Sequence, residues 1–496
     1  MTSTGRGVVL KGLADVAAKA AGFIALPVVI QFAGAAGYGA YSQVSTIVGF
    51  LVPFAALGLG GGIVRFFSIE PWTDAVRARF VRVMGLVLLA ALVPSAATAW
   101  WAASLNAAFV RWEHGTELIR WGAALIVAGA LEQVILELLR SQHRIVEFAC
   151  FQLTQTCLVV LATLLLLPLG YGLVALLEVA VAIKLATVAT VFLGFWTWNR
   201  PHRGDMPRTG AEIGRMIRFG LPVAVSGLGL WMMNVSDRLV VGHYLAPTAL
   251  GRYSAVYTFA SLLIAVNGPL NLPLYPRLMT AVASGDGDAV GRCIRTFHRY
   301  ATLVLVPAGF LLVALTNPLL ILMGGEGVRV SGLLVAMIVA AAFLDQWNAI
   351  AHYSLLCVDE VVFVRNAWFA LGAVNLMANV FVVPVLGLLG AAFVSLVTFV
   401  LLEAAIFRKA CAFYPLTSHY RFDVAIKAGI SALLAVAGVV LLGRFLPPTS
   451  KTVVASVVVF GLVYGGMLVL FRELGTPEVR LAARALGLRA AAPARE

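Results

Sequence analysis

Residues 158–167 read Leu-Val-Val-Leu-Ala-Thr-Leu-Leu-Leu-Leu, a run that is apolar on every side of a helix. A helix that is hydrophobic all round is buried in a large core or faces lipid. A membrane β-barrel would instead alternate polar and apolar residues. Similar runs recur along the chain without the two-residue period of a strand. The sequence therefore predicts an all-α integral membrane protein.

The composition of the 496-residue chain leads to the same fold class. Hydrophobic residues make up 61% and charged residues 12%, with a mean hydropathy of +0.95. Such a chain cannot cover a water-facing surface, which excludes a soluble enzyme, and it is too apolar to be disordered. Since one span needs roughly 20 residues, we predict about 14 transmembrane helices: 8–34, 40–66, 80–103, 118–139, 148–168, 172–198, 217–242, 249–275, 299–317, 329–352, 365–384, 386–407, 425–446 and 452–471.

The net charge of +13 indicates membrane orientation rather than binding to nucleic acid. Lys and Arg concentrate in cytoplasmic loops of membrane proteins. If the N-terminus is cytoplasmic, the outer segments receive few of them, namely Arg111, Arg120, Arg252, Arg329, Arg444 and Lys451. We therefore expect both termini in the cytoplasm. The five cysteines lack Cys-x-x-Cys spacing, which argues against a disulfide framework or a zinc site.

A sequence repeat is the most informative feature of the chain. Gly39-Ala-Tyr-Ser42 recurs as Gly251-Arg-Tyr-Ser254, and Arg65 recurs as Arg277 at the same offset of 212 residues. Three further matches follow in order with offsets of 213 to 216: Asp74-Ala-Val with Asp288-Ala-Val, Leu131-Glu-Gln with Leu344-Asp-Gln, and Pro168 with Pro384. Five matches in order indicate an internal duplication.

The repeat defines the predicted domain organisation. Each copy holds six spans, an even number, so both copies have the same orientation and a pseudo-twofold axis along the membrane normal. Transporters are often built this way, with the substrate path between the halves. We predict an N-terminal six-helix lobe at 1–200, a polar cytoplasmic linker at 201–216 and a C-terminal six-helix lobe at 217–410. Residues 411–496 then supply two extra spans and a cytoplasmic tail.

These motifs resemble those of a known family. The Gly-x-Tyr-Ser segments after spans 1 and 7, the segment 234–238 (Asn-Val-Ser-Asp-Arg) and the two six-helix lobes resemble Wzx-type bacterial polysaccharide flippases. These flippases belong to the multidrug/oligosaccharidyl-lipid/polysaccharide exporter superfamily. The resemblance covers about residues 8–410, and the two extra C-terminal spans also occur in that family.

The resemblance implies a function, a substrate and a location. The family moves an oligosaccharide linked to undecaprenyl pyrophosphate across the bacterial inner membrane by alternating access, for exopolysaccharide, O-antigen or capsule synthesis. A cationic cavity between the lobes is lined largely by spans 1, 2, 7 and 8. The implied partners are this lipid-linked substrate and membrane lipids. Whether polysaccharide polymerase or export proteins also bind stays open.

Charged residues within the spans are the candidate site residues, because intramembrane charge is costly and by default functional. Asp15 and Lys19 lie four residues apart on one helix face, where Lys19 faces an anionic headgroup or the two form a neutralised pair near the interface. Asp237 and Arg238 are adjacent and point in different directions. They contribute either to a gate between the lobes or to fixing span 7 against span 8, through Arg252.

Two further pairs are related by the repeat. Glu132 and Asp345 lie deep in spans 4 and 10, where they act in a proton or cation relay or as hydrogen-bonded carboxyl groups that pack each lobe. Arg65 and Arg277 lie at the inner ends of spans 2 and 8. We expect them to form a paired anion site at the cytoplasmic mouth, since guanidinium groups suit pyrophosphate. The alternative is that both only mark the positive-inside boundary.

Two other functions compete with a flippase. A cation-coupled multidrug exporter of the same superfamily would favour an acidic cavity, whereas Lys19, Arg65, Arg238 and Arg277 outnumber Asp15 and Asp237 here. A membrane-embedded glycosyltransferase or polymerase usually needs a large outer loop with catalytic groups, which this chain lacks. Because no nucleophile elbow, His-Glu-x-x-His or Walker motif occurs, we expect no enzymatic activity, no metal and no cofactor.

Overall fold

The computed structural model describes residues 3–67, 74–198, 209–447 and 449–473, with the side chains of 3–20, 65, 74–75, 195–198, 209–213, 223, 226 and 272 left out. Within these ranges the chain is helical and contains no strand. The helices are α1 (Ser3–Ala55), α2 (Leu59–Phe67), α3 (Asp74–Trp100), α4 (Ala102–Leu105), η1 (Asn106–Val110), α5 (Gly115–Ser141), α6 (Ile145–Leu166), α7 (Leu173–Trp198), α8 (Thr209–Tyr244), α9 (Pro247–Ala260), α10 (Leu262–Ala283), α11 (Gly287–Gly324), η2 (Glu326–Val328), α12 (Gly332–Trp347), α13 (Ala349–Cys357), α14 (Val361–Cys411), α15 (Leu416–His419), α16 (Phe422–Phe445) and α17 (Ser450–Leu470).

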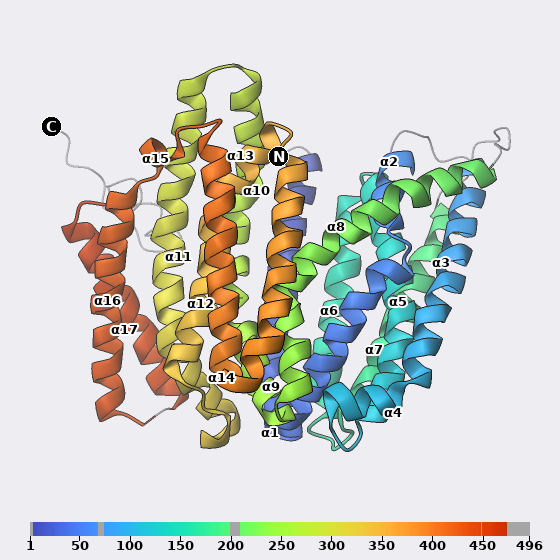
Figure 1. Ribbon diagram of the computed structural model, residues 1–496, viewed down its shortest axis with the longest axis horizontal. Helices are drawn as coiled ribbons and strands as arrows, with labels where there is room; N and C mark the ends of the chain where they lie inside the picture. Colours follow the sequence, from blue (N-terminus) through green and yellow to red (C-terminus); the bar gives the residue numbers. More distant parts are fainter. Residues whose placement is uncertain (1–2, 68–73, 199–208, 448, 474–496) are drawn as a thin grey trace.

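Two of the longest helices are each broken by a glycine. Gly34 in α1 has φ 70° and Gly387 in α14 has φ 59°, left-handed values that glycine adopts without steric penalty. At each glycine the chain turns back across the molecule (Figure 1). The described residues contain 11 candidate membrane spans, or 12 with the bent pair in α8. Because α1 and α14 each supply two crossings, the structure is compatible with the predicted fourteen.

The helices form two groups that lie side by side (Figure 1). Buried apolar residues of α2, α3 and α5 build the core of the N-terminal group, and those of α9, α11 and α12 build a core of the C-terminal group. α8 connects the groups, since Met216 in its first half packs into the N-terminal core and Met233 in its second half packs into the C-terminal one. The lobe boundaries at 1–200 and 217–410 stay a prediction.

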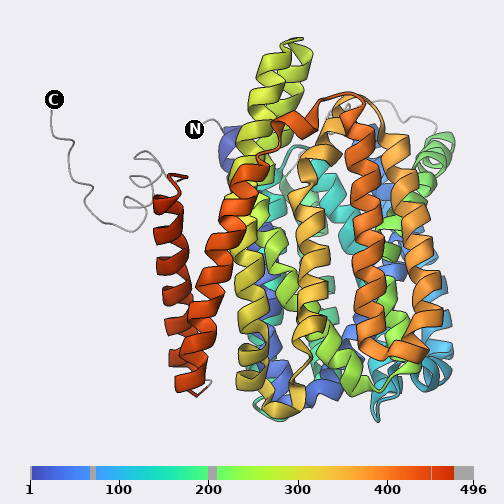
Figure 2. The same ribbon diagram turned by 60° about the vertical axis from the view of Figure 1, so that its left-hand side comes forward.

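The last two long helices stand at one side of the molecule, against α11 (Figure 2). Val424 and Ala428 on α16 and Phe460 on α17 are buried in the shared core with α11. The hydroxyl of Tyr464 donates to the carbonyl of Leu303 at 2.9 Å. α16 and α17 therefore extend the C-terminal group.

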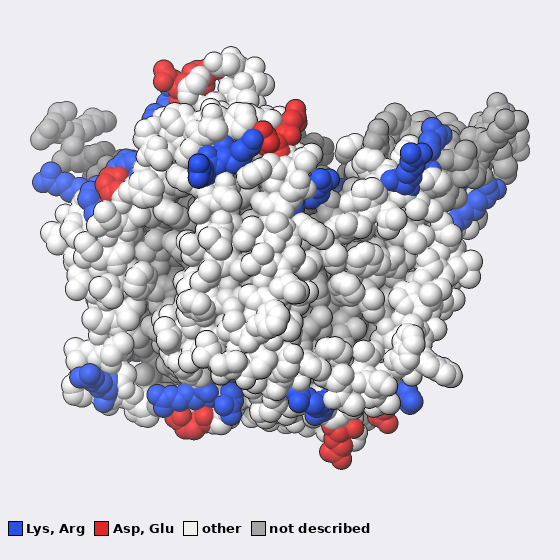
Figure 3. All heavy atoms as spheres, viewed as in Figure 1, with Lys and Arg blue, Asp and Glu red and all other residues white. Residues whose placement is uncertain are grey.

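The surface is divided into bands. Lys, Arg, Asp and Glu gather along the upper and lower edges in Figure 3, with a broad uncharged belt between them. The belt is the part of the surface that lipid chains would cover. The first turn of α1 and the last turn of α17 lie toward the same edge (Figure 1). The chain is thus a multi-pass membrane protein whose described ends share one face.

Candidate functional site

The two Gly-x-Tyr-Ser segments meet where the helix groups touch. Gly39 on the second segment of α1 packs so closely on the start of α9 that an added Cβ would clash with the carbonyl oxygen of Pro247. A Cβ on Gly251 would likewise clash with the carbonyl oxygen of Ala35. The hydroxyl of Ser42 donates to that of Ser254 at 2.8 Å. The repeated motifs therefore form a contact between symmetry-related helices, which we call the motif contact.

Further polar bonds hold the groups together at the lower edge in Figure 1. The hydroxyl groups of Tyr38 and Thr258 lie 2.8 Å apart. Arg111, which follows η1, donates to the carbonyl oxygens of Gly242 and Leu245 at the C-terminal end of α8. Cations at this end of a helix complement its unpaired carbonyl groups. Together with the motif contact, these bonds close the lower edge of the interface.

A cavity of about 410 Å³, with a largely apolar wall that carries a few polar side chains, lies directly beside this closed edge. Its wall comes from α1, α5, α6 and α7, with Thr258 of α9 as the contribution of the C-terminal group. Glu132 on α5 and Lys184 on α7 form an ion pair in the wall. The Oε1 atom of Gln152 is buried and makes no hydrogen bond within the described part of the chain. The cavity thus offers a compensated charge pair and a free amide acceptor.

Asp237 lies in the core of the C-terminal group and is 1% exposed. Its Oδ2 accepts hydrogen bonds from Tyr253 at 2.6 Å, Tyr257 at 2.8 Å and Ser395 at 3.3 Å. The backbone N–H of Arg238 donates to Oδ1 at 2.8 Å. Of the two predicted roles, this geometry supports the fixing of span 7 against span 8, through tyrosines of α9 rather than through Arg252.

The guanidinium group of Arg238 lies over the ring of Tyr257. Its Cζ atom lies 4.6 Å from the centroid of the Tyr257 ring, which is cation–π geometry. Tyr257 therefore contacts both members of the pair, the carboxylate through its hydroxyl and the guanidinium through its ring. The predicted roles of Arg238 in substrate binding and of Asp237 in a gate stay predictions.

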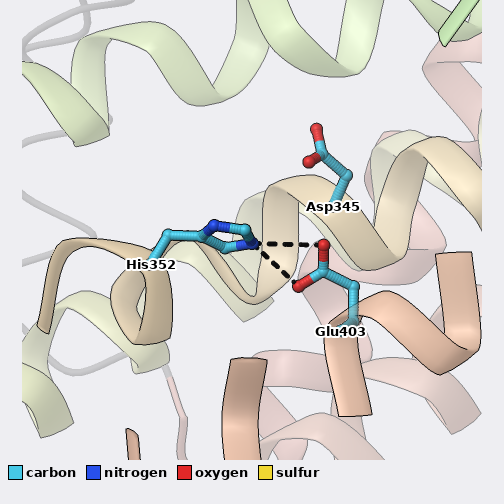
Figure 4. A group of neighbouring side chains, drawn as sticks. All are labelled: Asp345, His352 and Glu403. Carbon is cyan, nitrogen blue, oxygen red and sulfur yellow. Dashed lines mark hydrogen bonds and ion pairs between the residues drawn. The ribbon is translucent and has the colours of Figure 1, made fainter. Parts of the chain in front are cut away.

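Glu132 and Asp345, which are equivalent in the repeat, have different surroundings. Glu132 pairs with Lys184, whereas Asp345 near the end of α12 lies beside His352 of α13 and Glu403 of α14 (Figure 4). Lys184, His352 and Glu403 were not identified as site residues from the sequence. As charged or titratable groups in apolar segments they carried a signal, but nothing in the sequence connected them to their partners.

The distances between the remaining predicted site residues do not follow from the described part of the chain. Asp15 and Lys19 lie on the first segment of α1 and Arg65 lies on α2, but their side chains are outside the described part. Arg277 is exposed on α10. Both α2 and the end of α10 lie toward the edge where α1 begins, opposite the motif contact (Figure 1). The paired anion site of Arg65 and Arg277 stays a prediction.

Comparison with protein families gives one match. A family model described as polysaccharide biosynthesis protein matches residues 28–327, which is more than half of the chain. Comparison with curated protein sequences finds no match.

Several solved structures share the fold. The structure of the lipid II flippase MurJ in an inward closed conformation has a TM-score of 0.73 and 11% identity, over 94% of this chain and 99% of that chain. An inward-facing multidrug resistance transporter of the MATE family has a TM-score of 0.62 and 13% identity, over 81% of this chain and 95% of the other. A MOP superfamily transporter from Pyrococcus furiosus has a TM-score of 0.57 and 12% identity, over 84% of this chain and 96% of that chain. At these identities the likeness shows the fold.

Proposed function

Because the chain belongs to the polysaccharide biosynthesis protein family, we propose that it is a flippase for lipid-linked oligosaccharide. It moves an oligosaccharide linked to undecaprenyl pyrophosphate from the cytoplasmic to the outer leaflet of a bacterial inner membrane. Both chain termini lie in the cytoplasm. The chain binds and moves its substrate without changing it chemically.

The observation that carries this proposal is the motif contact. Two helix groups that touch through repeated segments at one edge can separate there and close at the opposite edge, which is the movement that alternating access requires. Ser42 and Ser254 make one short hydrogen bond, and Tyr38 and Thr258 make another. Arg111 adds hydrogen bonds to the carbonyl oxygens of Gly242 and Leu245. A small number of hydrogen bonds, each worth about 1–3 kcal/mol net, can be broken and remade in each cycle.

Two of the membrane-embedded carboxylates are already compensated, which supports an anionic rather than a cationic substrate. The carboxylate of Asp237 is buried among hydroxyl groups, and that of Glu132 is paired with Lys184. Neither carboxylate is left to attract a cationic substrate. Lys19, Arg65 and Arg277 then bind the pyrophosphate, because guanidinium and ammonium groups form charge-assisted bonds with phosphate oxygens.

The likeness to a multidrug resistance transporter favours a second candidate, a cation-coupled drug exporter. Both candidates share the fold and the alternating movement, so they differ only in cargo. Measurement of the cargo in cells separates them.

The experiment is deletion of the gene, followed by extraction of lipid-linked sugars and by measurement of drug sensitivity. We expect undecaprenyl-linked oligosaccharide to accumulate and surface glycan to fall, with restoration by the native gene and unchanged sensitivity to cationic dyes. An unchanged glycan profile with increased dye sensitivity would establish the drug exporter instead. Unchanged values in both assays would contradict both candidates.

A further inference from the structure

Three titratable side chains converge within the C-terminal group. Asp345 comes from α12, His352 from α13 and Glu403 from the second segment of α14, and the His352 ring is directed at the Glu403 carboxylate with Asp345 close by (Figure 4). One nitrogen or oxygen atom of each lies within 4.8 Å of one such atom of the others. Nε2 of His352 is 3.1 Å from Oε2 and 3.2 Å from Oε1 of Glu403. We call these residues the Asp–His–Glu cluster.

The cluster carries more negative than positive charge. The side chains of His352 and Glu403 are only 16% and 6% exposed. The charges that act on Asp345 are those of Glu403 and His352, and the described part of the chain supplies no Lys or Arg as a partner of either carboxylate. Even with a protonated imidazole paired to Glu403, the charges of the two carboxylates are not both compensated at membrane depth, which is costly. A divalent cation would cancel them.

Neighbouring amides hold the carboxylates in place. Nε2 of Gln346 donates to Oδ2 of Asp345 at 2.6 Å, and Nδ2 of Asn348 donates to Oε2 of Glu403 at 2.6 Å. The hydroxyl of Tyr420 donates to Oδ1 of Asn348 at 3.1 Å. Metal-binding carboxylates are commonly oriented by such outer hydrogen bonds.

The helix is interrupted within the cluster. α12 ends at Trp347 and α13 begins at Ala349, between Asp345 and His352. The carbonyl oxygen of Gln346 accepts a hydrogen bond from a side chain outside the helix, Nδ2 of Asn267 on α10, at 3.0 Å. In transporters, the C-terminal ends of interrupted helices often face bound cations. The interruption brings Asp345 and His352, which would otherwise lie almost two turns apart on one straight helix, within reach of Glu403.

We propose that Asp345, His352 and Glu403 bind one divalent transition-metal ion of the zinc class. Imidazole nitrogen with carboxylate oxygen is a donor set that such ions accept, and it is unsuited to sodium. Zinc bonds of about 2.0–2.1 Å place neighbouring tetrahedral ligands about 3.3 Å apart, close to the distances between His352 and Glu403. The ion ties α12, α13 and α14 together.

The test is metal titration of the full chain, purified in detergent and stripped of metal with a chelator. Titration with Co²⁺, followed by its visible d–d absorption, and with Zn²⁺ by calorimetry should give one ion per chain. His352→Gln and Glu403→Gln should each lower the affinity by at least about 100-fold. Asn348→Ala, which removes only an orienting amide, should lower it by about 10-fold.

Two control variants separate this cluster from other groups of the same kind. His243→Gln removes an exposed imidazole at the far end of α8, and Glu132→Gln removes a carboxyl group in the other helix group. Both should keep the native affinity. Size-exclusion profiles and thermal unfolding without metal report whether each variant is folded.

The result that would overturn the proposal is a folded native chain that takes up neither Co²⁺ nor Zn²⁺. Equal affinity in the native chain and in folded His352→Gln would overturn it as well, since the bound ion would then lie elsewhere. If His352→Gln or Glu403→Gln does not fold, the metal affinities of the native chain and of Asn348→Ala still test whether the ion binds at the cluster. No transport measurement enters the test, so its outcome is independent of the proposed cargo.

Discussion

Asp237 is stabilised by hydroxyl groups, whereas Glu132 is stabilised by an ammonium group. The difference matters for substitutions at these residues. A hydrogen bond from a neutral donor to a charged group contributes about 1.5–3 kcal/mol. Removal of one partner of a buried ion pair costs more, because a bare charge is left behind. The two carboxylates should therefore differ in how they tolerate loss of a partner.

Lys184→Met should destabilise the chain by about 3 kcal/mol, because it leaves the carboxylate of Glu132 without its cation. The double variant Glu132→Gln, Lys184→Met should be clearly more stable than Lys184→Met alone, since it removes both charges. Thermal unfolding in detergent is measured for the native chain, Glu132→Gln, Lys184→Met and the double variant. The four values give the coupling free energy between the two side chains. Additive effects would contradict a stabilising pair.

Arg65→Ala combined with Arg277→Ala should abolish most glycan export, since both guanidinium groups are predicted to bind one pyrophosphate. The single Arg→Lys variants should lose much of the activity, because a lysine cannot form the same paired bonds. Export is measured in cells at matched abundance and normal membrane insertion. Arg292→Ala, which removes an exposed arginine from another helix, is the matched control. Full export in the double variant would rule out the anion site.

At the scale of elements, the approach of α1 to α9 depends on the absence of two side chains. The backbone of Gly39 faces the carbonyl of Pro247, and that of Gly251 faces the carbonyl of Ala35. A backbone carbonyl cannot rotate away as a flexible side chain can. Any Cβ at these positions therefore forces the helices apart, although alanine is the better helix former.

Gly39→Ala should weaken closure at the motif contact, whereas Gly49→Ala on the same helix should not. A Cβ added at Gly49 meets no atom within 4 Å. Closure is measured by disulfide formation between Ser42→Cys and Ser254→Cys in a chain whose native cysteines are replaced, since the two hydroxyl oxygens lie 2.8 Å apart. Equal cross-linking in both glycine variants would show that the motif contact tolerates a Cβ.

At the scale of the whole molecule, the uncharged belt and the two charged edges define how the protein lies in a bilayer (Figure 3). The described ends of the chain lie toward one edge, and the motif contact lies toward the other (Figure 1). The positive-inside rule predicts that the edge with the chain ends faces the cytoplasm.

A reporter fused after Glu496 should be active only in the cytoplasm. In a chain without native cysteines, Lys451→Cys at the start of α17 should react with a membrane-impermeant maleimide in intact cells. Arg292→Cys, exposed at the opposite edge, should react only after lysis. The reverse labelling pattern, or a reporter active only in the periplasm, would invert the predicted orientation.

Membrane insertion, helical content and the presence of an internal repeat were predicted from the sequence itself. A bilayer requires backbone bonds to be satisfied within each helix, so an apolar run such as 158–167 predicts its own structure. The recurrence of Gly39 as Gly251 predicted related helices, and the structure shows that these residues meet. The family match confirms the resemblance to polysaccharide flippases at the level of family.

Only the tertiary structure decided which side chains are partners. Glu132 and Asp345 are equivalent in the repeat, yet one pairs with Lys184 and the other lies beside His352 and Glu403. A partner depends on the rotation of each helix about its axis and on which helix lies beside it. Apolar residues on all sides of a lipid-facing helix give no face that would fix this rotation. The contacts of Glu132 with Lys184 and of His352 with Glu403 join residues 52 and 51 positions apart, so no local pattern in the sequence records them.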